Sequence, residues 1–298
     1  MLKRIMCISF LSFFAVSYSQ SFAQQSVKSH DGTTIAIPAK PKIIALGGAI
    51  TEILYALGMS DAIIGVDVSS TYPEQAKSKP NVGYWRNLNA EAVLALQPNL
   101  IISTTEAGPA AVFGQIKKAG IPVLVVDAQY TIANAKAKIR LIAKAVNRVQ
   151  RGEELVTEME RDLASTELLK AKLKGNPSVL FIYARGQSLM LTSGKKTPAD
   201  AILKLAQVKN AVTQFDGVKP LTSEAVVASH PDIILMTTGG LKSLGGIDGV
   251  LKIPGVALTP AGKSRKIVEI DDLLLLGFST RMGKAIKELM TTLHPEIQ

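Results

Sequence analysis

The amino-acid sequence predicts an α/β fold with two lobes, in which each lobe is a mainly parallel sheet flanked by helices and one long helix joins the two. Three observations support this fold. Short apolar strands alternate with helical segments along most of the chain, one strand–helix unit occurs twice, and a proline-free helical stretch lies between the two copies. Alternating strands and helices favour parallel sheets that are covered on both faces.

The first 23 residues have the pattern of a secretory signal peptide. Lys3 and Arg4 precede an apolar run over 5–16, and small residues end at Ala23. That run is shorter than the roughly 20 residues that a membrane-spanning helix needs. We therefore predict a signal peptide over 1–23, cleavage after Ala23, and a periplasmic mature protein that does not span the membrane.

Composition excludes several classes of protein. The chain has 298 residues, of which 47% are hydrophobic, so it can bury a sizeable core. Its formal net charge is +10, but the basic residues are spread singly rather than in a stripe, and no nucleic-acid partner is expected. The only cysteine, Cys7, lies in the predicted signal peptide, so no disulfide is expected in the mature chain.

The N-terminal lobe is predicted to cover 24–130. It carries four apolar β-rich runs, and a glycine pair after the first of them leads into a helical segment. The expected strands are 42–46, 62–66, 100–103 and 123–126, and the expected helix is 51–57.

The segment 131–174 is predicted to be the interlobe helix. It contains no proline, has Gly152 as its breaker, and places apolar residues at helical spacing. A rigid helix between the lobes predicts only a small hinge motion when a ligand binds.

The C-terminal lobe is predicted to cover 175–298, with strands at 179–183, 233–236 and 267–270. The repeated unit occupies 90–102 in the first lobe and 223–235 in the second. Each copy has a polar start, an acid in the first helical turn, a proline stop and an apolar strand. The two acids at equivalent positions are Glu91 and Glu224.

The candidate binding residues are Tyr84 and Arg86, just before the first copy of the repeat. In an extended segment, residues two apart share a face, so both are expected to point the same way while Trp85 turns away. A phenol normally titrates near pH ~10, and a cation that hydrogen-bonds the phenolate lowers that pKa. Tyrosine oxygen is a known ligand of haem iron. The alternative is a surface loop whose tyrosine only packs.

Three segments, 83–91, 240–246 and 259–263, make the chain resemble the periplasmic haem-binding proteins of bacterial haem ABC importers. The resemblance implies that Tyr84 ligates ferric haem, that Arg86 hydrogen-bonds this ligand, and that haem b is the transported ligand. Some relatives add a histidine from the second lobe. The corresponding stretch 183–186 contains none, so a second protein ligand is not assigned.

The resemblance also implies a partner, a permease dimer of an ABC transporter in the inner membrane. In this class, one acid from each lobe docks onto permease arginines, which carries over to Glu91 and Glu224. Helix capping is the alternative for both acids. The protein is expected to be a monomeric receptor and not an enzyme.

Haem propionates need basic partners, and the sequence offers Arg185 and Lys242. Arg185 follows a predicted strand and Lys242 lies in a glycine-rich loop, both at strand ends where open α/β sheets bind ligands. The alternative for each is an exposed cation without a ligand.

Other functions remain open at this stage. A receptor of the same class for a ferric siderophore or a cobalamin is the first alternative, and an exported tetrapyrrole enzyme is the second. The enzyme would need a general acid or redox partner, which the sequence does not display. The three histidines, expected at the surface, are scattered and do not predict a zinc or manganese site: His30, His230 and His294.

Overall fold

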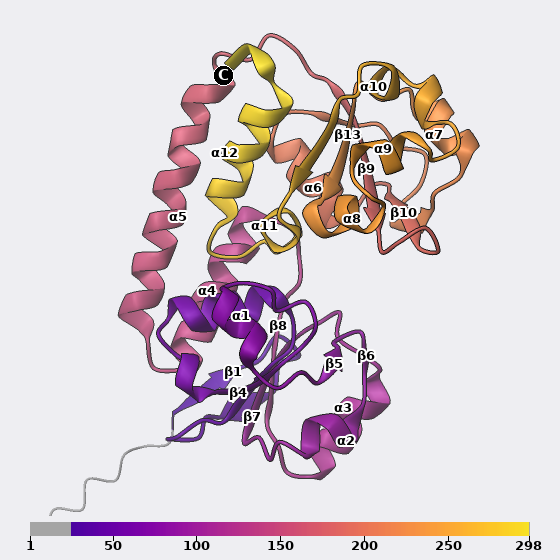
Figure 1. The fold of residues 1–298 in the computed structure, drawn as a ribbon. Coiled ribbons are helices and arrows are strands. Elements are labelled where there is room, and N and C mark those ends of the chain that lie inside the picture. The colour runs from indigo at the N-terminus through magenta and orange to yellow at the C-terminus, as the bar shows by residue number, and fades with distance from the viewer. Residues whose placement is uncertain (1–24, 298) are drawn as a thin grey trace, which may run out of the picture.

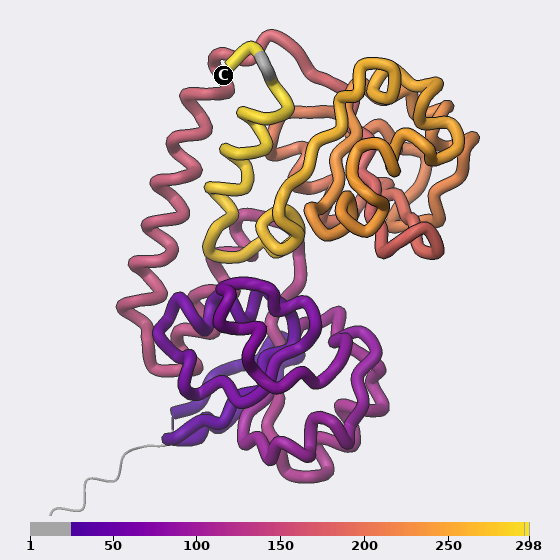
Figure 2. The backbone as a smooth tube through the Cα atoms, in the orientation of Figure 1, coloured from indigo at the N-terminus to yellow at the C-terminus, as the bar shows by residue number. Residues whose placement is uncertain are grey.

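The computed structural model describes residues 25–297 and confirms two α/β lobes, one above the other in Figure 1. The chain forms the lower lobe first and then crosses to the upper lobe through a long helix. Its last helix runs beside that long helix (Figure 2). The predicted signal peptide 1–23, with Cys7, lies outside the described residues.

The N-terminal lobe is built on a parallel sheet with the strand order β4-β3-β7-β8. All four predicted strands are present: β3 (Ile43–Ala45), β4 (Ile63–Val66), β7 (Leu100–Thr104) and β8 (Val123–Val126). The flanking helices are α1 (Gly48–Ala56), η1 (Ser60–Ala62), η2 (Glu74–Ser78), α2 (Ala90–Leu94) and α3 (Ala110–Lys118). Two small hairpins complete the lobe: β1 (Ser26–Lys28) with β2 (Thr34–Ala36), and β5 (Gly83–Tyr84) with β6 (Asn87–Leu88).

The C-terminal lobe has a mixed sheet with the strand order β12-β10-β9-β13-β14, and β11 also pairs with β9. The strands are β9 (Ser178–Ala184), β10 (Met190–Ser193), β11 (Lys209–Asn210), β12 (Val218–Pro220), β13 (Ile233–Thr237) and β14 (Ile267–Ile270). The helices are α6 (Pro198–Leu205), α7 (Ser223–Ser229), α8 (Thr238–Ser243), α9 (Ile247–Leu251), η3 (Val256–Leu258), α10 (Pro260–Lys263), α11 (Asp272–Leu276), α12 (Met282–Leu293) and η4 (Pro295–Ile297). Only the pairings of β10 are antiparallel, so this sheet is mainly parallel as predicted.

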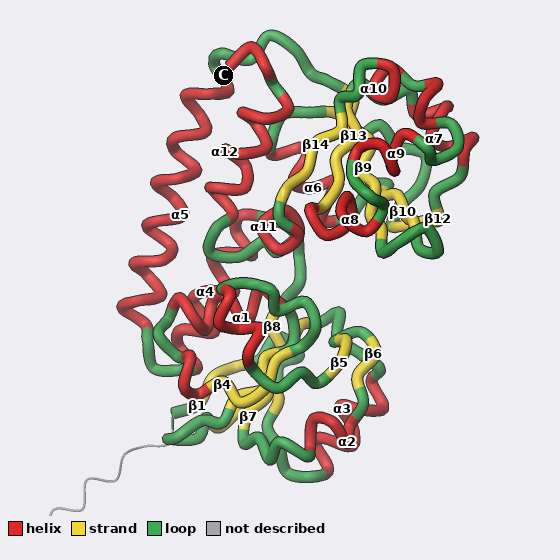
Figure 3. Tube along the Cα trace, viewed as in Figure 1, coloured by secondary structure: helices red, strands yellow, loops and turns green. Residues whose placement is uncertain are grey.

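The repeated unit folds the same way in both lobes. Asn89 caps α2 by accepting hydrogen bonds from the backbone N–H groups of Glu91 and Ala92. Thr222 caps α7 by accepting from Ala225. Each helix is followed by a buried parallel strand, β7 or β13, and Figure 3 shows these short helices on the outer flanks of the lobes.

The segment between the lobes contains two helices rather than one. α4 (Ile132–Ala145) ends before Asn147, which adopts a positive φ of 55°, and α5 (Val149–Lys170) runs alongside both lobes in Figure 1. Gly152, expected as the breaker, lies inside α5. A Cβ atom there would lie 2.4 Å from the Cβ of Ala143, so the glycine lets the two helices pack closely.

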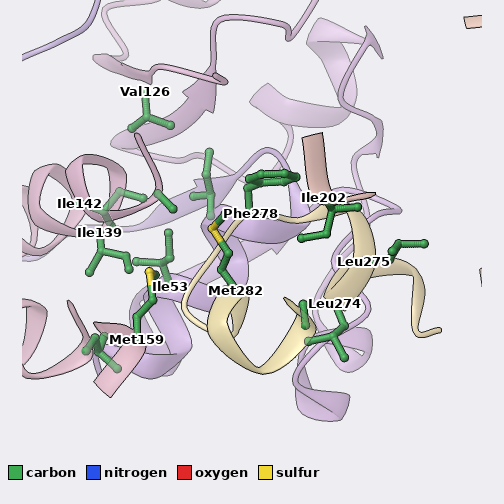
Figure 4. Close-up of a cluster of buried hydrophobic side chains, with 14 of the residues drawn as sticks. Ile53, Val126, Ile139, Ile142, Met159, Ile202, Leu274, Leu275, Phe278 and Met282 are labelled. Atoms are coloured by element: carbon green, nitrogen blue, oxygen red, sulfur yellow. The ribbon is translucent and has the colours of Figure 1, made fainter. Parts of the chain in front are cut away.

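One apolar core continues from lobe to lobe. It joins side chains of α1 and α4 to those of α5, α11 and α12. Figure 4 shows Phe278 and Met282, from the C-terminal lobe, in one cluster with Ile53 and Ile139. Because all four are 3% exposed or less, the junction is a packed interior rather than a flexible linker.

A buried ion pair reinforces this junction. The carboxylate of Glu52 on α1 accepts hydrogen bonds from Nε and Nη2 of Arg281, at 3.0 and 2.8 Å, and from the hydroxyls of Ser279 and Thr280. The Glu52 side chain is only 3% exposed. Both lobes are therefore held by the same buried carboxylate, and the small hinge motion stays a prediction.

Candidate functional site

Tyr84 and Arg86 lie on a tight β-hairpin. Gly83 pairs with Leu88 and Tyr84 with Asn87, which leaves Trp85 and Arg86 as the two residues of the turn. The expectation of an extended stretch is therefore wrong, because the chain reverses direction at this point. The hairpin still brings the two predicted side chains together.

The guanidinium of Arg86 makes the central contact of the site. Its Nη1 donates a hydrogen bond of 3.0 Å to the phenol oxygen of Tyr84. The guanidinium also lies 3.9 Å from the centroid of the Trp85 ring, which meets the Tyr84 ring edge-on at 5.9 Å. Trp85 was expected to turn away but instead supports the cation. Tyr84 remains 43% exposed, so its ring is accessible from outside.

Glu106, between β7 and α3, anchors the same guanidinium. Its carboxylate forms an ion pair with Nη2 of Arg86 and accepts a hydrogen bond from the hydroxyl of Tyr130. Burial alone would lower the pKa of Arg86, but the hydrogen bond to Tyr84 and the charge of Glu106 outweigh burial and raise it. Arg86 is therefore a permanent cation beside the phenol. Burial and the bond to Glu106 raise the pKa of Tyr130, which stays protonated.

A second Tyr-x-Arg pair comes from the other lobe. Tyr183 and Arg185 lie at the end of β9, where the Arg185 guanidinium is 4.8 Å from the Tyr183 ring centroid. Burial is the main cause of the raised pKa of Tyr183, and the charges of Tyr84 and Arg86 also act on this group. Each lobe therefore carries one Tyr-x-Arg pair, on the β5–β6 hairpin in the first lobe and at the end of β9 in the second. Tyr183 was not among the residues predicted from the sequence, although the Tyr-x-Arg spacing of 84–86 recurs at 183–185.

Arg185 already has an acidic partner in the structure. Its Nη2 lies 2.9 Å from Oδ1 of Asp272, whose other oxygen accepts from the backbone N–H of Gly239 at 2.9 Å. A ligand carboxylate at Arg185 would thus share the guanidinium with Asp272.

Lys242 does not lie in a loop as expected. It is an exposed residue in the last turn of α8, a helix held beside Arg185 by a 2.9 Å hydrogen bond from the N–H of Gly186 to Ser243. Within residues 25–297, no hydrogen bond or ion pair joins Lys242 to either Tyr-x-Arg pair. The structure brings Tyr84 and Arg86 into direct contact, while Arg185 pairs with Asp272 in the second lobe and Lys242 lies on the neighbouring helix α8.

Glu91 and Glu224 occupy equivalent exposed positions, as the repeat predicted. Each lies in the first turn of its helix, α2 or α7, while Asn89 and Thr222 supply the side-chain caps. A hydrogen bond from its own backbone N–H, followed by the hydroxyls of Thr222 and Ser223, lowers the pKa of Glu224. Both acids present charge to solvent.

Two further cavities lie away from the Tyr-x-Arg pairs. One of about 780 Å³ lies among α1, α5 and α12, and one of about 590 Å³ lies beside β2 and α3. Neither of these two cavities is lined by Tyr84 or Arg86. Donor chemistry, rather than enclosure, therefore marks the candidate site.

Histidines and carboxylates do not build an alternative metal centre in the part of the chain that the structure describes. His30 and His230 are exposed as expected, but His294 is fully buried, with Nε2 3.2 Å from the carbonyl of Ala206. Among residues 25–297, no helix is both long and apolar enough to cross a membrane.

Comparisons with known proteins agree with this architecture. Residues 43–274 match the sequence profile of the family described as "Periplasmic binding protein". The chain is 30% identical over 266 residues to an uncharacterized ABC transporter substrate-binding lipoprotein, YvrC, of Bacillus subtilis (strain 168), which covers 88% of this chain and 83% of that protein. It is 29% identical over 207 residues to the vitamin B12-binding protein of Pectobacterium atrosepticum, covering 68% and 74% of the two chains.

Among solved structures, the fold is similar to that of the periplasmic heme-binding protein RhuT from Roseiflexus sp. RS-1 in its apo form. The TM-score is 0.83 and the sequence identity 40%, over 87% of this chain and all of that one. The family profile covers most of the chain, and the relatives extend the match over both lobes. This chain therefore belongs to the periplasmic binding protein family, whose members are solute-binding proteins and not enzymes.

Proposed function

We propose that this protein captures ferric haem between its two lobes and delivers it to an ABC transporter of the inner membrane. The observation that carries the proposal is the 3.0 Å hydrogen bond from Arg86 to the phenol oxygen of Tyr84. The similarity to a heme-binding protein at 40% identity supports it.

The chemistry of the pair suits ferric iron. A phenolate is an anionic oxygen donor, and tyrosine oxygen is one of the protein ligands that hold haem iron. A cation that hydrogen-bonds the phenolate favours the charged form. Arg86 supplies that cation, since an arginine guanidinium stays protonated in proteins and its pKa is raised further by Tyr84 and Glu106. Tyr84 is the proposed axial ligand and Arg86 the group that stabilises it.

The second lobe is proposed to close over the other side of the ligand. Tyr183 offers a second phenol, and Arg185, whose guanidinium lies over the Tyr183 ring, offers a cation for a haem propionate. Lys242, on the neighbouring helix α8, is proposed as a further propionate partner. Haem b is the proposed cargo, because the proposed contacts are to the iron and the propionates and none of them would attach the porphyrin covalently.

The proposal is tested by titrating the mature apoprotein with hemin. Tyr84→Phe keeps the ring and removes the oxygen, so it is expected to abolish the tyrosinate charge-transfer band and shift the Soret band. Tyr55→Phe is the matched control, because Tyr55 is a half-buried tyrosine that lines the 780 Å³ cavity instead. Identical spectra for wild type and Tyr84→Phe would refute the assignment of the ligand.

Cobalamin is the second candidate, and one observation favours it: the 29% identity to a vitamin B12-binding protein. Cobalamin needs no protein oxygen on its metal, so its binding would leave the Tyr84–Arg86 contact without a role. Titration with cyanocobalamin separates the two, since tight binding that survives Tyr84→Phe would favour cobalamin. A ferric siderophore is the remaining alternative. Binding of a ferric complex that contains no porphyrin, measured in the same kind of titration, would identify it.

Export and docking complete the proposal. The signal peptide 1–23, cleaved after Ala23, would deliver a monomer to the periplasm. Glu91 and Glu224 are the proposed docking acids for the permease dimer. Their support is geometric: two exposed carboxylates occupy equivalent places on two similar lobes, so the protein presents one charged feature twice to a two-fold partner.

A further inference from the structure

Glu106 links the proposed ligand site to the junction between the lobes. Its Oε2 pairs with Nη2 of Arg86, while Nη1 of the same guanidinium donates to Tyr84. Its Oε1 accepts from the hydroxyl of Tyr130. The carboxylate therefore bridges two donors, and a continuous series of hydrogen bonds runs from the phenol of Tyr84 to Tyr130.

Tyr130 connects these hydrogen bonds to the second lobe through a packing contact. Its ring packs against that of Phe278, with centroids 5.5 Å apart and an interplanar angle of 57°. Phe278 belongs to the C-terminal lobe, is 3% exposed, and is part of the core that joins the lobes. Tyr130 is thus held by packing on one side and by Glu106 on the other.

An arginine in an exposed turn needs such support. Its long side chain loses rotamer entropy when it is fixed in one position. Trp85 restrains the guanidinium by stacking, but a ring face fixes only the plane. The direction of Nη1 toward Tyr84 requires a partner for the other nitrogen, and Glu106 is that partner.

We propose that Glu106 is a positioning residue for ligand capture, which acts by holding Arg86 against the Tyr84 oxygen and is itself fixed by Tyr130. This inference rests on the proposed function. Other charged groups also act near this carboxylate: Lys138 on α4 and, beyond it, Asp127 after β8. Neither makes a hydrogen bond to Arg86 within residues 25–297, so the positioning contact is specific to Glu106.

The test measures the rate at which bound ferric haem is lost to excess apomyoglobin. Glu106→Ala is expected to speed this loss about tenfold, the effect of one charge-assisted hydrogen bond. In an Arg86→Ala background the same change should have less than a twofold effect, because the group that Glu106 positions is already gone. Glu106→Gln, which keeps one acceptor, should give an intermediate rate and decides the matter if the alanine variant does not fold.

Glu153→Ala is the matched control, since it removes a carboxylate from an exposed pair with Arg140 far from the hairpin. An unchanged rate in Glu106→Ala and Glu106→Gln overturns the inference, as does an equal acceleration with and without Arg86, which indicates a general structural role. The tyrosinate spectrum of the wild type and its loss in Tyr84→Phe are recorded in parallel. If the wild type shows no tyrosinate spectrum, or Tyr84→Phe keeps it, both the proposed function and the positioning role are wrong. If the spectra are as expected but the Glu106 variants lose haem at the wild-type rate, only the positioning role is wrong.

Discussion

Replacing Arg281 by alanine is expected to lower the free energy of unfolding by about 3–5 kcal/mol, the usual cost of leaving one member of a buried ion pair without its partner. The Glu52 carboxylate would remain in the junction between the lobes, where its side chain is 3% exposed. The hydroxyls of Ser279 and Thr280 would still donate to it, but no cation would balance its charge.

Two features place the effect toward the upper part of that range. Arg281 donates through both Nε and Nη2, so two charge-assisted hydrogen bonds disappear at once. Its guanidinium also lies 3.5 Å from the centroid of the Tyr72 ring, a contact worth about 0.5–1 kcal/mol at partly exposed sites. Water that enters the position of the missing Arg281 side chain, which is 18% exposed, should recover part of the lost stability.

Urea unfolding followed by far-ultraviolet circular dichroism measures this free energy. The thermal midpoint should fall on the order of 10 °C. Arg140→Ala is the control, because its pair with Glu153 is about half exposed on both sides and should cost less than about 1 kcal/mol. Replacing both partners, Glu52→Leu with Arg281→Met, should restore much of the stability. A loss below about 1 kcal/mol in Arg281→Ala would refute this account of the junction.

Two further predictions concern buried charge and docking. Burial lowers the pKa of Lys138 from 10.5 to about 8, although the charges of Asp127 and Glu106 oppose this shift. The charged lysine therefore destabilises the folded state below about pH 8. The destabilisation fades as the pH rises from 8 toward 10.5, the pKa of lysine in the unfolded chain. Lys138→Met should therefore be more stable than the wild type at pH 7, with a difference that shrinks between pH 8 and 10.5 in urea titrations; a difference independent of pH would contradict the assignment. The double variant Glu91→Lys, Glu224→Lys should keep its hemin affinity within about twofold of the wild type but abolish permease-dependent growth on haem. The control Glu167→Lys, at an exposed acid of α5, should leave growth intact. Normal growth of the double variant would exclude docking through Glu91 and Glu224.

Sequence patterns predicted the fold well where a single periodicity decides it. The apolar runs at 43–45, 100–104 and 233–237 are strands in the structure, because a β-rich run bounded by turn residues has one way to be buried. The division of 132–170 into α4 and α5 was not predictable in this way. Asn147 interrupts the helix by adopting a positive φ, a conformation that asparagine tolerates but does not require.

The contact between Tyr84 and Arg86 was predictable from the sequence, but its geometry was not. Tyr84 and Arg86 were identified from their spacing, yet they meet across a hairpin turn rather than along a strand. Glu106 and Tyr130 could not be found from sequence, because Glu106 meets Arg86 and Tyr130 meets Glu106 only after β7 and β8 have been placed side by side. Long-range partners of this kind depend on the fold and leave no local pattern.

The central claim is that the Tyr84 oxygen binds the iron of ferric haem while Arg86 holds that oxygen. A crystal structure of the mature protein grown with hemin tests it most directly. The Tyr84 oxygen should lie within coordination distance of the iron, with Nη1 of Arg86 still hydrogen-bonded to it and the porphyrin between the two lobes. An iron ligated by another side chain, or a porphyrin bound away from the β5–β6 hairpin, would contradict it.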